Sequence, residues 1–372
     1  MRTTPDPQMP RGTDRAGPSP AVSVIVPVHD VAAHIGPCLQ SLREQTFTDF
    51  EVVVVDDGST DGSDRAARAA VAQDPRFRII RQANRGLSEA RNTGLDAATG
   101  AVIAFVDGDD RVMPDFLARM HRALVEHDAD WVACALRYCF GDGSGKAHSA
   151  IHDAEDLAAH PAARRYRFDD WCDVVRHFPS AWNKLYRRSL IEGLRFDPGT
   201  WFEDHAFFLR AAARTDHILH LPDPLYLQTQ GRPGQITASD DDRVFEQFAV
   251  LGTIRSVLAA GPHGAARTAF ARLAARLVFE RSTALRTPER RARFARTAAQ
   301  ALRAAGVDYS AQQDAGGAQA WGLEMGGETP LSVVLPWDGR DADALAATLE
   351  TLAAQDRKSA RLNSSHVCSS RM

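Results

Sequence analysis

Three aspartates within four residues are the side chains of this sequence best suited to bind a metal ion. Asp107, Asp109 and Asp110 follow the apolar run 101–106, which has the length and the β-branched content of a buried strand. Ligands of open α/β sheets bind beyond the carboxyl ends of the strands. The Asp-x-Asp spacing also lets two carboxylates reach one hard divalent cation. Because Asp-Gly is ordinary turn chemistry as well, the other motifs must decide between a cation site and a polar loop.

A second acidic pair, Glu203 and Asp204, is suited to take up a proton. The pair follows Trp201 and Phe202, and an apolar, aromatic neighbourhood raises the pKa of a carboxylate and so suits it to proton abstraction. Carboxylates in the first turn of a helix are also favourable with the helix dipole. Two roles are therefore open for this pair, a general base and a helix-terminal charge.

The elements that must position these acids alternate between strands and helices. Apolar runs predict buried strands at residues 22–28, 51–55, 77–80 and 101–106, with helical patterns between them. This alternation is typical of a mostly parallel sheet with helices on both faces. The expected fold class is α/β, a doubly wound nucleotide-binding architecture, followed by a helical region from about residue 244 to 305.

Other nucleotide and metal sites lack their motifs. The turn after the first strand reads Pro27-Val28-His29-Asp30, without the glycines that a dinucleotide-binding turn requires. No Walker phosphate loop is present, and neither acidic cluster has the spacing of an EF-hand. A nucleotidyltransferase stays open as an alternative, although a Gly-rich, basic loop after the first strand is also missing.

The bulk composition points away from nucleic-acid partners and from disulfide scaffolds. The 372 residues carry a formal net charge of −4, which gives no global attraction to nucleic acid. The five cysteines form no Cys-x-x-Cys pair, so neither structural zinc nor a disulfide framework is expected. The N-terminus lacks the apolar core of a signal peptide, and no apolar stretch approaches the roughly 20 residues that span a bilayer. We therefore expect a cytoplasmic protein.

Four motifs, taken together, resemble those of the family 2 glycosyltransferases. They lie in the family's order and spacing within roughly residues 21–240, and they read Val24-Ile25-Val26-Pro27, Val54-Val55-Asp56-Asp57-Gly58-Ser59-Thr60-Asp61, Asn84-x-Gly86-x-x-x-Ala90-Arg91-Asn92-x-Gly94 and Phe105-x-Asp107-x-Asp109-Asp110. The resemblance implies a GT-A fold, a nucleotide-sugar donor and an inverting transfer. It also implies a divalent cation, Mn²⁺ or Mg²⁺, that neutralises charge on the departing nucleoside diphosphate.

The resemblance assigns roles to residues of the donor site. Asp57 is implied to accept a hydrogen bond from the nucleobase, although a helix N-cap is its alternative role. Arg91 is implied to lie near the ribose and the diphosphate, Asp107 to contact the ribose, and Asp109 together with Asp107 to bind the cation. Asp110 is expected to organise the turn. The implied nucleotide-sugar-binding set is completed by Pro27, Val28 and Asn84.

The resemblance also assigns catalytic and acceptor residues. Asp204 is implied to be the base that deprotonates the acceptor hydroxyl, with Glu203 as the second choice. The implied acceptor-binding residues are Trp182, Asn183 and Lys184. Trp182 could instead pack in the core, and Lys184 could instead be an exposed surface charge.

The sequence departs from the family pattern at two points. Many relatives have an aromatic-Asn pair after the first strand, where this chain has His29-Asp30, and this leaves the base and the acceptor preference open. The Gln-x-x-Arg-Trp signature of processive synthases is absent, and residues 230–237 read Gln-Gly-Arg-Pro-Gly-Gln-Ile-Thr in its place. The absence of that signature favours the addition of one sugar per encounter.

Composition and internal repetition divide the chain into several parts. We expect a disordered leader at residues 1–20, a glycosyltransferase domain at 21–240, a helical extension at 241–305, a linker at 306–328, the truncated start of a second glycosyltransferase domain at 329–356 and a non-native tail at 357–372. The second start is indicated by Leu331-Ser332-Val333-Val334-Leu335-Pro336, whose pattern is similar to that of Val22-Ser23-Val24-Ile25-Val26-Pro27. Arginines line the helical extension and form either a solvated face or a contact with an anionic membrane or a phosphorylated acceptor.

The leading hypothesis is a metal-dependent, inverting glycosyltransferase that moves a single sugar to the hydroxyl of a glycan or lipid-linked acceptor. Cell-surface polysaccharide or glycan synthesis is the process that the resemblance suggests, and analogy favours a UDP-sugar as donor. A non-catalytic nucleotide-sugar-binding module of a tandem enzyme is the alternative, and replacement of Asp204 separates the two. Nucleic acid is not an expected partner, whereas the Arg-rich helices leave peripheral contact with the inner face of the membrane open.

Overall fold

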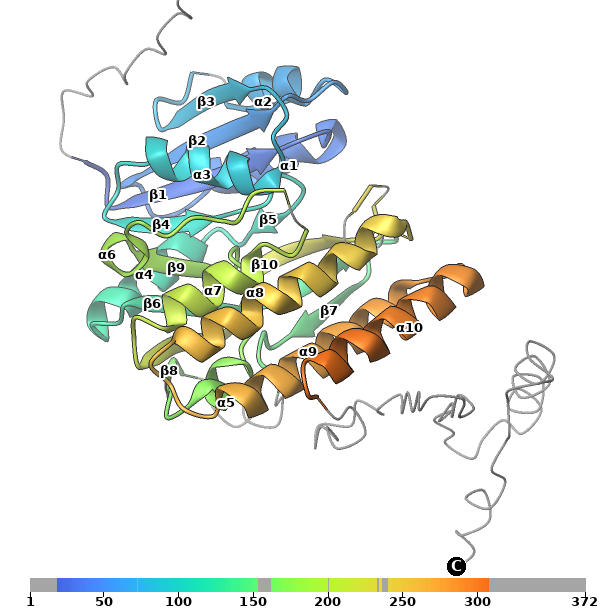
Figure 1. Cartoon of the computed structure of the whole chain (residues 1–372). Coiled ribbons are helices and arrows are strands. Elements are labelled where there is room, and N and C mark those ends of the chain that lie inside the picture. The colour runs from blue at the N-terminus through green and yellow to red at the C-terminus, as the bar shows by residue number, and fades with distance from the viewer. Residues whose placement is uncertain are drawn as a thin grey trace, which may run out of the picture. The chain divides into compact units, whose positions relative to one another are not determined.

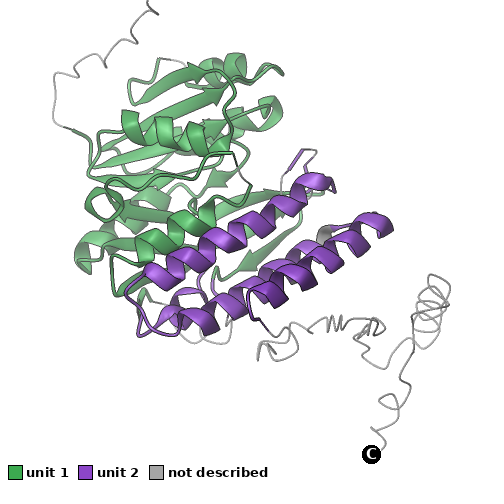
Figure 2. Ribbon diagram, in the orientation of Figure 1, with its two compact units in different colours: residues 1–150, 155–167, 179–230 green, residues 151–154, 168–178, 231–372 purple. Residues whose placement is uncertain are grey.

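The computed structural model describes residues 19–71, 73–152, 162–199, 201–232, 234–235 and 240–307. Figure 2 shows the two compact units into which the chain divides. Unit 1 takes the described parts of Met1–Ala150, Glu155–Arg167 and Pro179–Gln230, and unit 2 takes those of Ile151–Ala154, Phe168–Phe178 and Gly231–Met372. The predicted second-domain fragment and tail, and nearly all of the predicted leader and linker, lie outside the described residues.

Unit 1 is organised around one mixed β-sheet. Its strands are β1 (Val22–Val28), β2 (Phe50–Asp57), β3 (Phe77–Gln82), β4 (Val102–Phe105), β5 (Arg111–Val112), β6 (Trp131–Phe140), β7 (Gly145–His148), β8 (Arg164–Arg167), β9 (Lys184–Arg187) and β10 (His217–Gln230). Within the described residues these ten strands form a single sheet in the order β3-β2-β1-β4-β9-β6-β10-β5, with β7 beside β6 and β8 beside β10. The α/β class expected from the sequence is therefore confirmed.

The first half of the sheet has the parallel arrangement that the alternating pattern predicted (Figure 1). β1 pairs in parallel with β2 and β4, and β2 pairs in parallel with β3. Every residue of β1 and β2 is buried, as expected for strands covered on both faces. Val28 lies opposite Asp56, and Ile25 lies opposite Phe105. The turns after β1, β2 and β4 consequently meet at one edge of the sheet, where ligands of this architecture bind.

The second half of the sheet adds strands that the sequence pattern did not predict. β9 is antiparallel to β4 and β6, whereas β10 is parallel to β6 and antiparallel to β5. β9 has four residues and both ends are basic, so it lacks the apolar run that identifies a buried strand. β10 contains Pro222 and Pro224, and its register with β6 shifts there, because proline cannot donate a hydrogen bond to the ladder.

One helix of unit 1 lies unusually close to the sheet. The helices of this unit are α1 (Ala32–Arg43), α2 (Ser63–Val71), α3 (Leu87–Ala97), α4 (Phe116–Glu126), α6 (Arg188–Ile191) and α7 (Asp204–Ala212). A Cβ atom at Gly94 of α3 would lie 2.2 Å from Cγ2 of Ile25 in β1. Only glycine permits this approach without movement of the helix or the strand. Because α3 also carries Arg91, its close packing fixes that side chain relative to the sheet edge.

Unit 2 is helical within the described residues. It contains α5 (Trp171–Val174), the short 3-10 helix η3 (Asp242–Phe245), α8 (Glu246–Ala260), α9 (Ala266–Ala284) and α10 (Pro288–Ala304). Proline stands in the first turn of α10, where its missing N–H removes no helical hydrogen bond. Among the helices described, none has the length and apolarity needed to cross a membrane.

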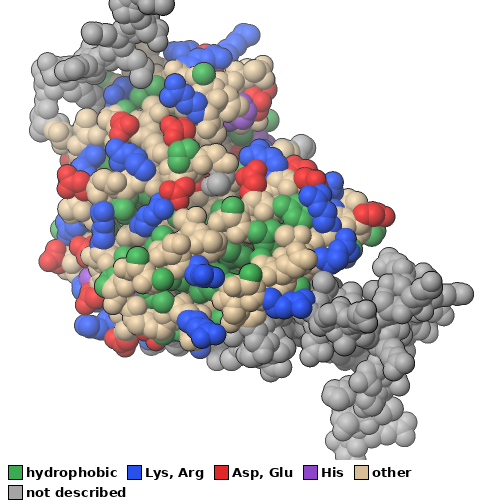
Figure 3. Space-filling model, viewed as in Figure 1, with side chains coloured by type: hydrophobic (Ala, Val, Ile, Leu, Met, Phe, Trp, Pro, Cys, Tyr) green, Lys and Arg blue, Asp and Glu red, His purple; other side chains and the backbone are tan. Residues whose placement is uncertain are grey.

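Several arginines of unit 2 are engaged in ion pairs. Nη1 of Arg290 lies 2.9 Å from Oδ1 of Asp240, and Nη1 of Arg293 lies 2.8 Å from Oδ2 of Asp242. On the face shown in Figure 3, Lys and Arg side chains are scattered among other residues instead of forming one basic patch. A role of these arginines at an anionic membrane therefore stays a prediction.

Candidate functional site

The loop after β4 holds its three aspartates in different environments. The side chains of Asp107 and Asp109 are partly exposed, whereas Asp110 is only 2 % exposed. Both carboxylate oxygens of Asp110 accept hydrogen bonds from β10, Oδ2 from the hydroxyl of Tyr226 and Oδ1 from the backbone N–H of Thr229, each at 2.8 Å. Asp110 therefore organises the turn and leaves Asp107 and Asp109 as the two partly exposed carboxylates.

The acidic loop combines burial with mutual repulsion. Burial raises the pKa of Asp110 well above its ordinary value, and the charges of Asp109 and Asp107 raise it further. Burial also raises the pKa of Asp107, against the opposing charge of Arg91. The loop runs close to β1, because a Cβ atom at Gly108 would lie 2.9 Å from the carbonyl oxygen of Pro27. A cation at this place would relieve the repulsion between the aspartates.

A buried arginine joins the acidic loop to the second acidic pair. Nη2 of Arg91 donates to Oδ1 of Asp107 at 2.8 Å, and Nη1 donates to Oδ1 of Asp204 at 2.6 Å and to Oε1 of Glu203. The arginine side chain is 1 % exposed, whereas those of Asp107 and Asp204 are 23 % and 17 % exposed. One guanidinium thus brings together carboxylates that the sequence assigned to cation binding and to proton abstraction.

Within the acidic pair, Glu203 is the more buried and Asp204 the more accessible. Burial raises the pKa of Glu203 to about 8, with a further contribution from the charge of Asp204, against the opposing charge of Arg91. Although burial opposes its own charge, Arg91 has a pKa raised above its ordinary value by Asp204, Asp107 and Glu203. The geometry therefore favours Asp204 as the member of the pair that reaches a substrate.

The backbone before α7 is shaped to present this pair. Phe202 has a φ of 67°, in the left-handed region that bulky residues rarely adopt. Asp204 is the first residue of α7, and its Oδ2 accepts a hydrogen bond from the backbone N–H of Ala181 at 3.2 Å. Strained backbone of this kind is concentrated at functional sites, and here it directs the chain into α7 beside Arg91.

Asp57, the predicted nucleobase contact, lies at the end of β2 and is 2 % exposed. Its Oδ1 accepts hydrogen bonds from Nε2 of Gln82 at 2.7 Å and from the backbone N–H of Arg85 at 2.9 Å, and its Oδ2 accepts from the N–H of Gly86 at 2.7 Å. The carboxylate therefore holds the turn that leads into α3. Its contact with a nucleobase stays a prediction.

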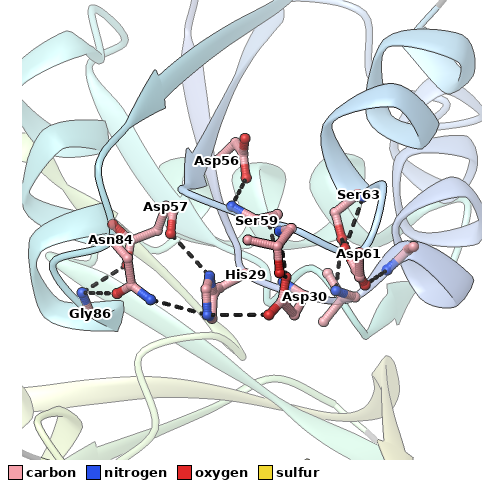
Figure 4. A network of polar contacts seen from close by, with 12 residues as sticks. His29, Asp30, Asp56, Asp57, Ser59, Asp61, Ser63, Asn84 and Gly86 are labelled. Carbon is pink, nitrogen blue, oxygen red and sulfur yellow. Dashed lines mark hydrogen bonds and ion pairs between the residues drawn. The ribbon is translucent and has the colours of Figure 1, made fainter.

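The accessible groups at this corner are His29 and Asn84 (Figure 4). Nδ1 of His29 lies 3.0 Å from the carbonyl oxygen of Asp57, and Nε2 lies 3.1 Å from Nδ2 of Asn84. Since a carbonyl only accepts, Nδ1 carries the proton and Nε2 accepts from the amide. Asp30 lies on the other side of the ring, with Oδ2 3.6 Å from Nε2. The His29-Asp30 departure noted in the sequence is thus part of one polar network with Asp57 and Asn84.

The loops after β2 and β3 meet closely at this corner. Gly58 has a φ of +72°, and a Cβ atom there would lie 2.7 Å from the backbone nitrogen of Asn84. Glycine is required on both counts, because a side chain would be strained and would collide with the neighbouring loop. This contact sets Asn84 beside His29.

The three predicted acceptor residues, Trp182, Asn183 and Lys184, are buried and packed against their neighbours. Trp182 is 6 % exposed and stacks on the ring of Tyr226, with centroids 4.6 Å apart and planes at 29°. Nζ of Lys184 donates to the carbonyl oxygen of Ser180 at 2.7 Å and to Oδ1 of Asn183 at 2.8 Å. Burial lowers the pKa of Lys184 to about 7. The contact of these residues with an acceptor stays a prediction, and their burial favours a supporting role.

The contacts made by Tyr226 and Thr229 were not anticipated from the sequence. Both residues lie on β10, and Tyr226 is 116 residues from its partner Asp110. Local periodicity carries no signal for such a pairing, because it depends on how distant strands are placed in the sheet. An aromatic hydroxyl next to two prolines would have been the only local hint.

Sequence comparisons place the chain among known proteins. The profile of glycosyl transferase family 2 matches residues 23–195. The chain is 37 % identical over 213 residues to the putative glycosyltransferase EpsH of Bacillus subtilis, which covers 56 % of this chain and 60 % of EpsH. It is 30 % identical over 229 residues to the glycosyltransferase GlyG of Streptococcus pneumoniae, covering 60 % of this chain and 75 % of GlyG. The chain thus spans about three fifths of the length of EpsH.

Two solved structures share the fold. S. aureus TarS 1-349, in complex with UDP-GlcNAc, superposes with a TM-score of 0.59 at 22 % identity and covers 76 % of this chain and 81 % of that one. The mannosyltransferase PcManGT from Pyrobaculum calidifontis, in complex with GDP-Man and Mn²⁺, superposes with a TM-score of 0.53 at 21 % identity, covering 90 % and 81 %. With the motifs at its sheet edge and its match to GlyG over three quarters of that protein, the chain belongs to the family 2 glycosyltransferases and has a GT-A fold followed by C-terminal helices.

Proposed function

We propose that this protein transfers a single sugar, with inversion, from a nucleotide-diphosphate donor to a hydroxyl acceptor. The observation that carries the proposal is the position of Arg91 between Asp107 and Asp204. The first carboxylate belongs to the loop expected to bind the donor, and the second is the expected base. A single buried guanidinium therefore sets the distance between the proposed base, Asp204, and the proposed donor-binding carboxylate, Asp107.

The donor set of the acidic loop fits a divalent cation. Asp107 and Asp109 offer hard carboxylate oxygens on partly exposed side chains, and Mg²⁺ is usually held by one or two carboxylates together with substrate phosphates. Within the described residues no group of three or more His, Cys, Asp or Glu side chains could hold a metal ion. When bound, Mn²⁺ or Mg²⁺ would neutralise the charge of the departing nucleoside diphosphate. The complex of PcManGT with Mn²⁺ supports a divalent cation in this fold.

The corner of His29, Asn84 and Asp57 is the place for the nucleobase in this proposal. His29 offers an imidazole face, and its side chain is 43 % exposed. Asp57 holds the turn on which Asn84 sits. A UDP-sugar is the favoured donor, which the complex of TarS with UDP-GlcNAc supports by analogy. Pro27 and Val28 would line the same edge from β1.

Asp204 is the proposed base of the transfer. The acceptor oxygen forms a bond to the anomeric carbon while the bond from that carbon to the diphosphate breaks, and the diphosphate leaves with the bonding electrons. The hydroxyl proton passes to the Asp204 carboxylate, which Arg91 and the N–H of Ala181 hold in place.

The acceptor and the cellular process complete the proposal. The proposed acceptor is the hydroxyl of a glycan or of a lipid-linked molecule, and the proposed process is cell-surface polysaccharide or glycan synthesis, which the resemblance to the family suggests. A cytoplasmic location with peripheral contact at the membrane through the arginines of α9 and α10 belongs to the same proposal. Because the chain belongs to the family 2 glycosyltransferases, we no longer propose the nucleotidyltransferase alternative.

Two substitutions test the catalytic proposal against a non-catalytic binding module. Asp204→Asn should lower the rate of sugar transfer by about 100-fold or more, the usual contribution of a general base, and should leave donor affinity nearly unchanged. Glu203→Gln should retain most of the activity. The measurement is release of nucleoside diphosphate together with isothermal titration of the donor, with Asp197→Asn as a control, since that aspartate pairs with Arg210 elsewhere in unit 1. Normal transfer by Asp204→Asn would remove Asp204 as the base.

A further inference from the structure

The hydroxyl of Tyr226 lies between two residues of the acidic loop. It donates to Oδ2 of Asp110 at 2.8 Å and accepts from the backbone N–H of Asp107 at 3.1 Å. A phenolic hydroxyl has one proton to donate and lone pairs with which to accept, and this one uses both capacities on the same loop. The phenol thus bridges the first and the last aspartate of the Asp-Gly-Asp-Asp segment.

A second residue of β10 secures the middle of the loop. The N–H of Thr229 donates to Oδ1 of Asp110 at 2.8 Å, and its hydroxyl Oγ1 donates to the carbonyl oxygen of Asp109 at 2.5 Å. Together Tyr226 and Thr229 contact each of the three aspartates through a backbone or side-chain atom.

The ring that carries this hydroxyl is itself fixed. Tyr226 is fully buried, and Trp182 stacks on it with centroids 4.6 Å apart. The ring of Phe116 packs edge-on against the Tyr226 ring, with centroids 6.4 Å apart. Rotation of the phenol away from the loop would require these rings to repack, and packed cores resist such changes.

We infer that Tyr226 is a positioning residue for the divalent-cation loop, with Thr229 as its second support. Through its hydroxyl it holds Asp107 and Asp110 so that the carboxylates of Asp107 and Asp109 are set for the cation before the donor arrives. This inference rests on the proposed function, because it presumes that the loop binds a cation together with a nucleoside diphosphate. It also gives Trp182 a role, since its stacking holds Tyr226 in place.

Such preorganisation should increase the affinity for the cation, because a loop that is not held in place must lose conformational entropy when the cation binds. Removal of the hydroxyl alone leaves the ring, its burial and its stacking intact. What it does remove is a hydrogen bond to a buried carboxylate and one acceptor for a backbone N–H. The loss should appear in the binding of the cation and of the metal-dependent nucleotide, and less in the stability of the fold.

The experiment is a calorimetric titration of the full chain with UDP, with and without Mn²⁺, accompanied by electron paramagnetic resonance of free Mn²⁺. For Tyr226→Phe we expect the apparent dissociation constant of Mn²⁺ in the presence of UDP to rise about tenfold, the effect of losing one charge-assisted hydrogen bond. Nucleotide binding without Mn²⁺ should be unchanged. Excess Mn²⁺ should restore transfer activity, because the base at Asp204 is untouched.

Tyr186→Phe is the matched control. Tyr186 is also fully buried in the same unit, and its hydroxyl donates to the carbonyl oxygen of Ala181 at 3.4 Å. Thr229→Val removes the hydroxyl that contacts Asp109 but keeps the N–H that contacts Asp110, so it should weaken Mn²⁺ binding in the same direction. Thr229→Ser, which keeps the hydroxyl, should restore it.

The results separate the inference from the proposed function. If the unaltered chain binds UDP with Mn²⁺ and both Tyr226→Phe and Thr229→Val bind it equally well, Tyr226 is only a packing residue and the inference is overturned. If the unaltered chain binds neither UDP nor GDP with Mn²⁺, the proposed function fails and the inference fails with it. Should Tyr226→Phe not fold, the comparison of Thr229→Val with Thr229→Ser decides.

Discussion

Nη1 of Arg91 donates to Oδ1 of Asp204 at 2.6 Å, although 113 residues separate them along the chain. The other terminal nitrogen of the same guanidinium donates to Asp107 at 2.8 Å. Since the guanidinium is planar and rigid, its two terminal nitrogens fix Asp204, the proposed base, relative to the acidic loop. In the proposed function, catalysis and donor binding therefore both depend on one side chain that is itself closed to solvent.

Replacement of Arg91 should therefore damage stability and activity together. Arg91→Ala leaves Asp107, Glu203 and Asp204 without their shared cation, and we expect the free energy of unfolding to fall by about 3–5 kcal/mol. Arg91→Lys keeps the charge but not the fork, so the protein should fold while kcat falls by at least about tenfold. Urea unfolding and steady-state kinetics are the measurements.

The control for this series is an arginine at the surface of the same unit. Arg195 pairs with Asp96 at 2.6 Å, but its side chain is 49 % exposed, so Arg195→Ala should cost less than about 1 kcal/mol. Equal losses for Arg91→Ala and Arg195→Ala would show that the buried cluster contributes nothing special.

The raised pKa of Glu203 predicts a pH-dependent stability. In the folded protein this pKa is about 8, because of burial and the charge of Asp204, against 4.5 for a free glutamate. Between these values the folded state holds a proton that the unfolded state has released, so the stabilising contribution is full below pH 4.5 and declines as the pH rises toward 8. The free energy of unfolding should therefore fall as the pH rises from roughly 5.5 to 7.5.

Glu203→Gln should remove this slope, because the amide does not titrate. Urea unfolding of both proteins across the same pH range measures the difference between them, with Glu192→Gln as an exposed control that should keep the slope. Parallel curves for the unaltered chain and Glu203→Gln would mean that Arg91 holds Glu203 ionised at neutral pH.

The approach of α3 to β1 predicts a strong effect at one glycine. Gly94→Ala would place a Cβ atom 2.2 Å from Ile25, and we expect a loss of about 1–3 kcal/mol from overpacking. Because α3 carries Arg91, transfer activity should fall as well. Gly252→Ala in α8 is the control, since nothing lies within 4 Å of its added Cβ, and it should be neutral or stabilising by up to about 1 kcal/mol. Thermal unfolding of the two variants decides, and a Gly94→Ala protein as stable as Gly252→Ala would contradict the close packing.

The parts of the fold that could be predicted from the sequence are those encoded locally. The strands that precede Asp57 and Asp107 are continuous apolar runs, and their parallel pairing follows from the helices between them. The family motifs then pointed to the acidic loop and to the pair Glu203 and Asp204, which the structure joins through Arg91. Each of these signals lies within a few neighbouring residues.

The rest depended on contacts between distant segments. The strand β9 and the hydrogen bonds from β10 to Asp110 have no local periodicity that would reveal them. β6 does begin with an apolar run, at residues 131–136, which the strand prediction overlooked. The burial of Lys184 could not be predicted either, because a lysine is normally exposed, and here Ser180 and Asn183 satisfy its ammonium group. The same holds for Asp57, whose carboxylate is taken up by the turn before α3.

The most direct test of the account is the binding of nucleoside diphosphates by the unaltered chain and by Asp109→Ala. We expect calorimetry to show binding of UDP, or of GDP if the base preference differs, that depends on Mn²⁺ and is lost in Asp109→Ala. Asp115→Ala, on the N-cap aspartate of α4, whose side chain is 45 % exposed, should bind as the unaltered chain does. Binding of neither nucleotide to the folded protein, or Mn²⁺-dependent binding that survives in Asp109→Ala, would contradict the proposed donor site.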